Sequence, residues 1–421
     1  TRAIRTFVSR ALAGLCTDLE DPLPESLIRR LALEPRCIAF VQVHFPPSGT
    51  SASSLSAGQT AAHRRLALEE LYRLQKSFAA ARGLRASLRG YSCRLSAESR
   101  KRMMGLASFD LTRGQQAALE EILGDLARGT PMARMLQGDV GCGKTIVALL
   151  AALAVMECGH QVAWMAPTEI LASQIARQAA KLLETTGHSC ALLTSHTRGE
   201  SGEALRTALE EGSTRLIIGT HALIQENVRF RSLAFAIVDE QHRFGVRQRD
   251  SLGAKGRNPH QLVMTATPIP RSMAMALYGD LDLSVIDEMP SGRSPVRTAL
   301  RTSSERARIY RFVREEVKQG GRAAFVVPTL RDSDRTPAGT SALSVFLRLS
   351  STIFPDLGTG LLHGKLPWEE RERIMSRFAS GEIQVLVATT VLEVGIDVPE
   401  ASVVVVEQAD RFGLAQLHQI R

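Results

Sequence analysis

Short apolar runs alternate with longer helical stretches through most of this chain. Between residues 106 and 288, runs of strand length recur at 133–136, 161–166, 189–193, 215–219, 235–238 and 261–265. Beyond residue 296 the alternation begins again, with strands expected at 323–327, 360–362, 385–388 and 403–406. Strands separated by helix-length segments are typical of parallel sheets with crossover helices. The pattern therefore predicts an α/β fold with two parallel-sheet domains in tandem.

The first 105 residues lack this alternation. Residues 61–82 have helical periodicity, and the spacing predicts one apolar face formed by Leu66, Leu71, Leu74 and Phe78. A Ser/Ala/Gly-rich loop is expected at residues 49–58. We therefore expect a mainly helical region over residues 1–105, a first sheet domain over 106–288 and a second over 289–421. Asp287 to Pro295 contains Pro and Gly and is predicted to be the hinge between the sheet domains.

A candidate phosphate-binding loop follows the first predicted strand. Its sequence is Gly138-Asp139-Val140-Gly141-Cys142-Gly143-Lys144-Thr145. It fits the pattern G-x-x-x-x-G-K-[ST], in which glycines let backbone N–H groups approach phosphate oxygens. Lys144 is expected to reach the β- and γ-phosphates, and the Thr145 hydroxyl to bind Mg²⁺. The apolar run 146–156 predicts a buried helix, ended near Gly159, with its N-terminus toward the phosphates.

Two adjacent carboxylates, Asp239 and Glu240, follow the apolar strand 235–238. Ligands bind at the carboxyl ends of strands in open parallel sheets. Adjacent acids at such a place are costly unless a cation or a reaction uses them. Asp239 is expected to hold Mg²⁺, and Glu240 to orient and deprotonate an attacking water. Alone, such a pair is more often part of a solvated loop, but the phosphate-loop pattern favours hydrolysis of a nucleoside triphosphate.

The stretch Asp239-Glu240-Gln241-His242-Arg243-Phe244-Gly245-Val246 resembles motif II of superfamily-two helicases, in the form typical of the RecG branch. Other stretches resemble that family's motifs in the same order: Ala166–Ala172 (Ia), Gly219–Ala222 (Ib), Thr265–Arg271 (III), Ala388–Pro399 (V) and Leu414–Gln419 (the start of VI). The likeness is dense from about residue 105 to residue 421 and weaker at 43–47 and 65–71.

The resemblance implies two tandem RecA-like domains with ATP between them, and it assigns roles to individual residues. Catalysis would involve Lys144, Asp239, Glu240, Gln241 and His242. The nucleotide would also be contacted by Gly395 and Asp397, and its base by Phe109 and Gln115. Domain closure would be coupled to the phosphate state by Thr265, Thr267, Arg243 and Arg271. DNA phosphates would be contacted by Thr168, Thr220, His221, His363, Thr389 and Thr390.

Each of these residues also has a plainer interpretation. A glutamine at a helix start, such as Gln115, is often a solvated surface residue. Each threonine at a strand end can be an ordinary cap, and His363 can be a satisfied loop histidine. Arg243 and Arg271 can form surface salt bridges instead. As a set on matching loops, the residues favour the functional interpretation.

Composition is compatible with a nucleic-acid partner. The net charge of +9 suits a polyanion without requiring one. Aromatic residues make up 5% of the chain, which disfavours base stacking and favours phosphate contacts. The six cysteines are scattered without a C-x-x-C pair, which indicates a reducing compartment without a disulfide framework or zinc site. The longest apolar run, 146–156, is too short to cross a bilayer.

The function that the resemblance implies is an ATP-dependent double-strand DNA translocase that remodels stalled forks and Holliday junctions in DNA repair and recombination. A monomer in the bacterial cytoplasm is expected, with branched double-stranded DNA as partner, ATP and Mg²⁺ as cofactors and no membrane association. One alternative is the motor of a transcription-repair coupling factor, but Gln241 and Pro167-Thr168-Glu169 favour RecG. The other is a catalytically silent ATP- and DNA-binding module.

The two ends of the sequence depart from the family pattern. Motif VI runs Q-x-x-G-R-x-G-R in the family, and its later arginines reach the γ-phosphate, whereas this sequence ends at Gln419-Ile420-Arg421. It also starts without Met and includes little of the family's wedge domain. A fragment that binds ATP and DNA but turns over weakly or not at all is therefore expected.

Overall fold

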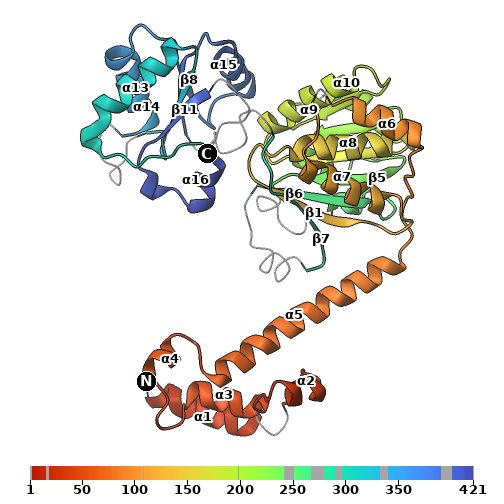
Figure 1. Ribbon diagram of the computed structural model, residues 1–421, viewed down its shortest axis with the longest axis vertical. Coiled ribbons are helices and arrows are strands. Elements are labelled where there is room, and N and C mark those ends of the chain that lie inside the picture. Colours follow the sequence, from red (N-terminus) through yellow and green to blue (C-terminus); the bar gives the residue numbers. More distant parts are fainter. Residues whose placement is uncertain are drawn as a thin grey trace. The chain divides into compact units, whose positions relative to one another are not determined.

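The computed structural model describes residues 2–15, 19–107, 109–197, 199–240, 251–266, 279–290, 296–331, 340–389 and 401–420. The chain forms two compact units (Figure 1). One comprises Thr1–Ser87 with Ile269–Leu281, and the other comprises Leu88–Pro268 with Asp282–Arg421. The second unit contains two separate parallel sheets, and the first is helical, which confirms the predicted fold class. The predicted boundaries at residues 105 and 288 stay predictions.

The helical unit contains α1 (Arg2–Leu15), α2 (Glu25–Arg30), α3 (Arg36–His44), α4 (Ala52–Ser56) and α5 (Ala61–Ser87). The predicted loop at 49–58 thus contains a short helix. The predicted apolar face of α5 is wrong in part, because Leu71 is 49% exposed. The buried residues of α5 are Ala62, Arg65 and Glu69. Two of these three are charged, so ion pairs contribute to holding the start of this helix.

Arg65 is the centre of this ion-pair cluster. Its side chain is buried and donates to both carboxylate oxygens of Asp21 at 2.6 and 2.7 Å. It also donates to Glu69 at 3.1 Å and to the backbone carbonyl of Glu34 at 3.2 Å. Arg36 pairs with Glu69 at 2.9 Å. A buried charge is tolerated where partners surround it, so these contacts fasten the start of α5 to the segment from Asp21 to Arg36.

In the part of the chain that the structure describes, the first sheet has seven strands, all parallel to their neighbours, in the order β3-β4-β2-β5-β6-β1-β7. The strands are β1 (Ala133–Gly138), β2 (Gln161–Met165), β3 (Cys190–Leu193), β4 (Leu216–Gly219), β5 (Leu233–Val238), β6 (His260–Thr265) and β7 (Asp282–Ile286). The six predicted strands are confirmed, and the edge strand β7 was not predicted. The helices of this part are α6 (Ala97–Gly105), α7 (Arg113–Leu126), α8 (Lys144–Glu157), α9 (Glu169–Leu183), α10 (Gly199–Glu211) and the 3₁₀ turn η1 (His221–Ile224).

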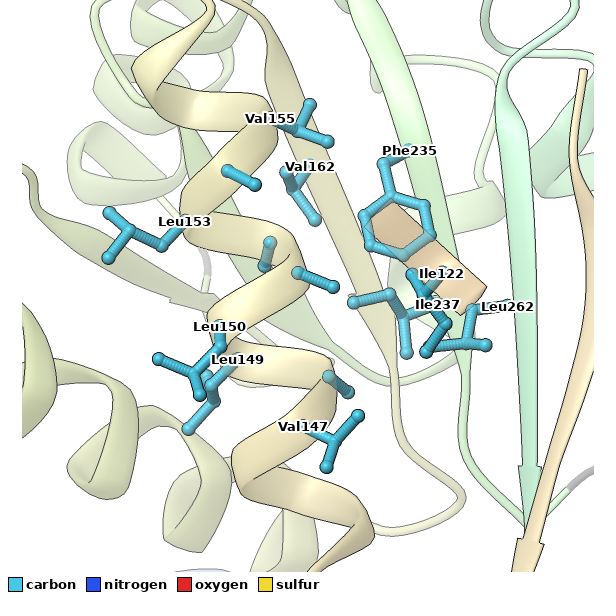
Figure 2. Close-up of a cluster of buried hydrophobic side chains, with 14 of the residues drawn as sticks. Ile122, Val147, Leu149, Leu150, Leu153, Val155, Val162, Phe235, Ile237 and Leu262 are labelled. Atoms are coloured by element: carbon cyan, nitrogen blue, oxygen red, sulfur yellow. The ribbon is translucent and has the colours of Figure 1, made fainter. Parts of the chain in front are cut away.

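Helix α8 is the most buried helix of this sheet region. All ten residues from Val147 to Met156 are buried, as the apolar run predicts. Figure 2 shows Val147 and Val155 of α8 on the side of the strand residues Val162, Phe235 and Ile237. The helix ends where Gly159 adopts a left-handed conformation with φ of 87°. Apolar packing therefore fixes the helix that starts at the predicted phosphate loop.

The second sheet has four parallel strands in the order β11-β8-β10-β9. The strands are β8 (Arg322–Val326), β9 (Thr359–Leu362), β10 (Val385–Ala388) and β11 (Ala401–Val406). The helices are α13 (Arg306–Lys318), α14 (Ala342–Arg348), α15 (Trp368–Ser380) and α16 (Leu414–Ile420), with short turns η3 (Ser303–Glu305), η4 (Leu349–Ile353) and η6 (Ala409–Arg411). Phe325, Phe354 and Val387 belong to a core of its own, built from residues 309–405.

Two further findings bear on the predictions from composition. Cys37 on α3 is disulfide-bonded, so the expectation of a chain without disulfides is wrong at this residue. The spacing of cysteines along a sequence does not reveal which of them a fold brings together. Within the described ranges, no helix has both the length and the apolar character needed to span a membrane.

Candidate functional site

The carboxyl ends of neighbouring strands in the first sheet gather most of the predicted site residues. The register pairs Gln137 of β1 with Thr265 of β6, and Val263 of β6 with Val238 of β5. The phosphate loop, Thr265 and Asp239 therefore follow three adjacent strands at one edge of the sheet. Strands β2 and β4, which end before Thr168 and Thr220, continue the same edge on the far side of β5. The residues predicted to bind the nucleotide and those predicted to bind DNA thus lie along the same end of the sheet, where the strands have their carboxyl ends.

The glycines of the loop are required by its geometry. Gly141 and Gly143 have φ of 78° and 90°, in the left-handed region that favours glycine. A Cβ atom on Gly143 would lie 2.2 Å from Nε2 of Gln115, and one on Gly138 would lie 2.4 Å from Sγ of Cys142. No side chain caps the first turn of α8 at Gly143. Backbone N–H groups at such a helix start are suited to bind an anion.

Lys144 is held against the loop. Its ammonium group donates to the backbone carbonyls of Gly138 at 2.8 Å and Asp139 at 2.9 Å. Asp139 in turn accepts the N–H of Val140 at 2.7 Å. The neighbouring Cys142 is buried, and burial raises the pKa of its thiol, so it serves as a packed apolar residue of the loop. Thr145 follows Lys144 as the second residue of α8, and its side chain is partly exposed.

Gln115 is buried, and both ends of its amide are hydrogen-bonded. Its Oε1 accepts the N–H of Thr112 at 2.9 Å, and the Thr112 hydroxyl accepts the N–H of Gln115 at 3.2 Å, which forms a capping box at the start of α7. Its Nε2 donates to the backbone carbonyl of Cys142 at 2.8 Å. Gln115 therefore supports the phosphate loop, and the alternative of a solvated surface residue is wrong. Phe109, which precedes this helix, is 50% exposed.

Asp239 is a buried carboxyl at the end of β5. Its N–H donates to the carbonyl of Met165 at 2.9 Å, and its Oδ1 accepts the N–H of Glu240 at 3.0 Å. Burial, followed by the nearby Glu240, raises the pKa of Asp239 to about 7, although Lys144 opposes this shift. Because β5 and β1 are parallel and both pair with β6, this carboxyl and the loop lie at the same end of the sheet. Oxygen donors from Thr145 and Asp239 are the kind that Mg²⁺ prefers.

Glu240 has a strained backbone. Its φ of 50° places it in the left-handed region, which is uncommon for residues other than glycine. Such strain is found most often at functional sites, where the surrounding structure holds it. Glu240 therefore follows Asp239 directly at the end of β5, and its role toward an attacking water stays a prediction.

The second part of the edge contains the predicted DNA-contacting residues of this sheet. The Thr168 hydroxyl accepts the N–H of Leu171 at 3.4 Å, which is the helix-cap role that the plainer interpretation predicts. Thr220 is 2% exposed, and its hydroxyl has no hydrogen-bond partner among the described residues. His221 is exposed at the start of η1. Unlike the Thr168 hydroxyl, the Thr220 hydroxyl makes no hydrogen bond to a described residue.

The structure adds a loop to this edge that the sequence did not indicate. Residues 194–197 follow β3, the neighbour of β4. Glu169 accepts the Ser195 hydroxyl at 2.7 Å and lies 3.4 Å from Nε2 of His196. His196 is half exposed. The signal that could have indicated this loop is the run of small polar residues directly after an apolar strand.

In the second sheet, His363 and Thr389 follow the adjacent strands β9 and β10. His363 accepts the N–H of Lys365 on its Nδ1 at 3.2 Å, and burial lowers its pKa. Thr389 is 8% exposed, and its N–H donates to the carbonyl of Leu362 at 3.2 Å. The remaining predicted residues lie outside the described ranges: Gln241, His242, Arg243, Thr267, Arg271, Thr390, Gly395 and Asp397.

Comparisons with known proteins agree with this arrangement. The DEAD/DEAH box helicase family model matches residues 112–276, and the helicase conserved C-terminal domain matches residues 306–421. The ATP-dependent DNA helicase RecG of Thermotoga maritima is 43% identical over 420 residues, which are 100% of this chain and 53% of that protein. RecG of Bacillus subtilis is 41% identical over 421 residues, 100% of this chain and 61% of that protein. The chain thus spans between about half and three fifths of these relatives.

Solved structures give the same result. A structure of RecG bound to a three-way DNA junction has a TM-score of 0.77 and 41% identity, and the match covers 100% of this chain and 54% of that chain. The DEAD-box helicase Mss116 bound to single-stranded RNA has a TM-score of 0.57 at 18% identity, covering 77% of this chain and 70% of that chain. The second likeness shows a shared fold alone.

Proposed function

Because this chain belongs to the RecG family of ATP-dependent DNA helicases, we propose that its first sheet binds and hydrolyses ATP to drive movement on branched double-stranded DNA. The observation that carries this proposal is the placement of the phosphate loop after β1 and of the buried carboxyl of Asp239 after β5, the two strands that flank β6. It joins a phosphate-binding group and a cation-binding group at one sheet edge. The relatives are longer than this chain, so the activity of the whole protein is part of the proposal.

The nucleotide part would work as follows. The glycine loop and the first turn of α8 would bind the phosphates through backbone N–H groups, and the Lys144 ammonium would move from the carbonyls of Gly138 and Asp139 to the β- and γ-phosphates. Thr145 and Asp239 would hold Mg²⁺, which supplies positive charge against the phosphate oxygens. Burial raises the pKa of Asp239 to about 7, so a bound cation would favour the ionised form of this carboxyl.

Glu240 would be the general base. It would accept the proton of a water that attacks the γ-phosphorus as ADP leaves, while Asp239 would keep its charge for Mg²⁺. Gln115 would hold the loop through its bond to the Cys142 carbonyl at 2.8 Å. Adenine recognition by Gln115 would require its side-chain amide to give up the hydrogen bond to Thr112 or to Cys142 and to bond to the base instead. Phe109, whose ring is exposed, would stack on the base.

The second part of the edge would bind DNA through phosphates. His221 is exposed at the start of η1, and the loop at 194–197 adds Ser195 and the half-exposed His196. The Thr220 hydroxyl is buried and would have to become accessible before it could contact a phosphate. Backbone N–H groups and short hydroxyls bind phosphates without reading sequence. In the second sheet, Thr389 and His363 would add contacts at two further strand ends. Remodelling of forks and Holliday junctions would follow from movement along such a backbone.

A catalytically silent module is the competing function, and one substitution separates the two. Glu240→Gln keeps the shape of the side chain and removes the base. In a protein of the relatives' full length, we expect unchanged binding of a fluorescent ATP analogue with Mg²⁺, while DNA-stimulated turnover falls roughly 10²-fold or more, the scale of a lost general base. If the wild-type protein shows no turnover above background, or if the variant turns over like wild type, the hydrolytic function is wrong.

A further inference from the structure

Two free cysteines lie together at the end of α8 that is remote from the phosphate loop. Cys158 is the C-terminal cap of α8, and its Sγ lies 3.8 Å from the backbone carbonyl of Arg94. Cys93, the residue before Arg94, is part of the hydrophobic cluster against which Cys158 packs. A hydrogen bond joins the two side chains, with Cys93 as the donor. Both residues belong to the same compact unit, so their contact lies within one part of the molecule.

The backbone on each side of this contact is fixed by hydrogen bonds. The N–H of Cys93 donates to the carbonyl of Leu126, the last residue of α7, at 2.8 Å. The N–H of Cys158 donates to the Ala154 carbonyl at 3.3 Å, within the last turn of α8. Because the ends of two packed helices hold the two residues, the fold itself keeps the thiols close to each other.

The two thiols differ in access and in charge state. Cys93 is 3% exposed, whereas Cys158 is partly exposed. Burial, followed by the neighbouring Cys158, raises the pKa of Cys93 to about 12. Burial also raises the pKa of Cys158, but the hydrogen bond from Cys93 opposes this shift. Cys158 is therefore the thiol that a solute can reach and whose thiolate its partner stabilises, which are the properties of an attacking cysteine.

We propose that Cys93 and Cys158 are an oxidative modification site at which hydrogen peroxide produces a reversible disulfide. The Cys158 thiolate would attack the peroxide: an S–O bond forms as the O–O bond breaks, which gives a sulfenic acid and hydroxide. The Cys93 sulfur would then attack the Cys158 sulfur, so that an S–S bond forms and the hydroxyl group leaves as water. Together the two thiols are oxidised, and one peroxide is reduced to two waters.

The disulfide would close a ring that includes the phosphate loop. Between residues 93 and 158 lie α6, α7, β1, the loop and α8. A cross-link stabilises mainly by restricting the unfolded chain, and more so when the closed loop is long. Cys158 is about 20 Å along α8 from Lys144, so the folded loop is not touched by the new bond. We expect oxidation to suppress local opening of α7 and α8 and to leave ATP binding unchanged.

The first experiment maps disulfides in the wild-type protein. The reduced protein is treated with hydrogen peroxide, its remaining thiols are alkylated, and its peptides are analysed by mass spectrometry without reductant. We expect a peptide pair joined through Cys93 and Cys158, which dithiothreitol separates. Because the pKa of Cys158 is raised, the pair should form faster at pH 9 than at pH 7. If this pair is missing at both pH values, the proposal is overturned.

Two substitutions test the order of the steps. In Cys93→Ala, which leaves a small apolar side chain in the cluster, peroxide should produce a sulfenic acid on Cys158 that dimedone captures. In Cys158→Ser, Cys93 should stay reduced because peroxide does not reach it. Dimedone on Cys93 in the second variant, without dimedone on Cys158 in the first, would contradict the assignment of Cys158 as the attacking thiol.

Cys190→Ala is the matched control. Cys190 is also a partly exposed thiol whose pKa burial raises, but it lies on edge strand β3, with its Sγ 3.4 Å from the Ala176 carbonyl. The Cys93–Cys158 pair should form in this variant as in the wild-type protein. If the pair were lost in Cys190→Ala, the disulfide would depend on a third thiol, which would refute a direct step between the two.

Hydrogen exchange tests the effect on the fold. Peptides covering 113–126 and 144–157 should exchange about tenfold or more slowly in the oxidised wild-type protein than in the reduced protein. In Cys93→Ala, peroxide should leave these rates unchanged. Equal rates in fully cross-linked and reduced wild-type protein would refute the restraint on α7 and α8. A protein that forms the disulfide but does not bind ATP would refute the proposed function and leave the modification site standing.

Discussion

The two parallel sheets share a layout but differ in chemistry. In both, neighbouring parallel strands deliver polar residues to one edge: Asp239, Thr265 and Thr220 in the first sheet, His363 and Thr389 in the second. The first sheet also carries the glycine loop and a buried carboxyl whose pKa is raised to about 7. In the second sheet, β8 is followed by Val327-Pro328-Thr329 instead of a glycine loop. The shared fold therefore places polar residues at the strand ends of both sheets. The loop sequences decide which sheet has the groups for a nucleotide site.

The two sheets also have separate hydrophobic cores. With the partly buried residues included, the clusters of the first sheet are built from residues 91–286, and those of the second from residues 309–405. Phe235 and Phe325 occupy comparable positions, each fully buried in a central strand of its sheet. Because neither cluster borrows a described residue from the other, each sheet should be able to lose stability alone.

Truncating these two rings gives the largest expected effect. Phe→Ala in a packed core costs about 3–5 kcal/mol. We expect Phe235→Ala to accelerate hydrogen exchange in the strands of the first sheet and Phe325→Ala in those of the second, each without affecting the other sheet. An ATP analogue with Mg²⁺ should slow exchange chiefly in the first sheet. If either substitution destabilised both sheets equally, the two cores would be one cooperative unit, and the comparison would fail.

A smaller effect is expected from acid, and it should fall mainly on the first sheet. His260 is fully buried; its Nδ1 accepts the Met132 N–H at 3.0 Å, and its Nε2 donates to the Tyr91 carbonyl at 2.8 Å. Burial lowers its pKa, so the neutral ring is favoured in the fold. The stability it contributes is present above the unfolded pKa of about 6.5 and is lost as pH falls below that value.

At about 1.4 kcal/mol per pH unit, the loss is at most about 2 kcal/mol at pH 5. The measurement is urea unfolding at pH 5 and pH 8 for the wild-type protein and for His260→Gln, which keeps a donor and does not titrate. The difference between the two proteins isolates His260 from Asp239, whose raised pKa acts in the opposite direction. His363 is partly exposed, so the second sheet should respond less. An identical pH dependence in both proteins would contradict this role of His260.

Most of the fold could be predicted from the sequence, whereas the roles predicted for the nucleotide-site residues stay predictions. Strand β10 has the predicted bounds, Val385–Ala388, and α8 extends the predicted helix by a few residues. These elements are buried on all sides, so their sequences are almost uniformly apolar. Strand β7 was missed because it is an edge strand with exposed positions and polar residues, so it lacks the continuous apolar run of the buried strands.

The ion pairs that hold some of these elements in place could not be predicted from the sequence. Apolar periodicity predicted that Leu71 lies in a buried face of α5. The helix buries Arg65 instead, and Arg65 pairs with Asp21, which is 44 residues away in the chain. The same holds for Arg85, whose partner Asp280 is 195 residues away. Ion pairs of this separation leave no periodic signal, because nothing near either residue in the chain indicates its partner.

The central claim is that the first sheet binds ATP through its phosphate loop, and Lys144→Ala tests it most directly. A hydrogen bond to a charged group contributes about 1.5–3 kcal/mol, so losing the ammonium should weaken binding of a fluorescent ATP analogue with Mg²⁺ by about 10–100-fold or more. Lys365→Ala, which removes an exposed lysine from the second sheet, is the control and should bind like wild type. The account predicts this difference between the sheets; equal affinity in the wild-type and Lys144→Ala proteins would contradict it.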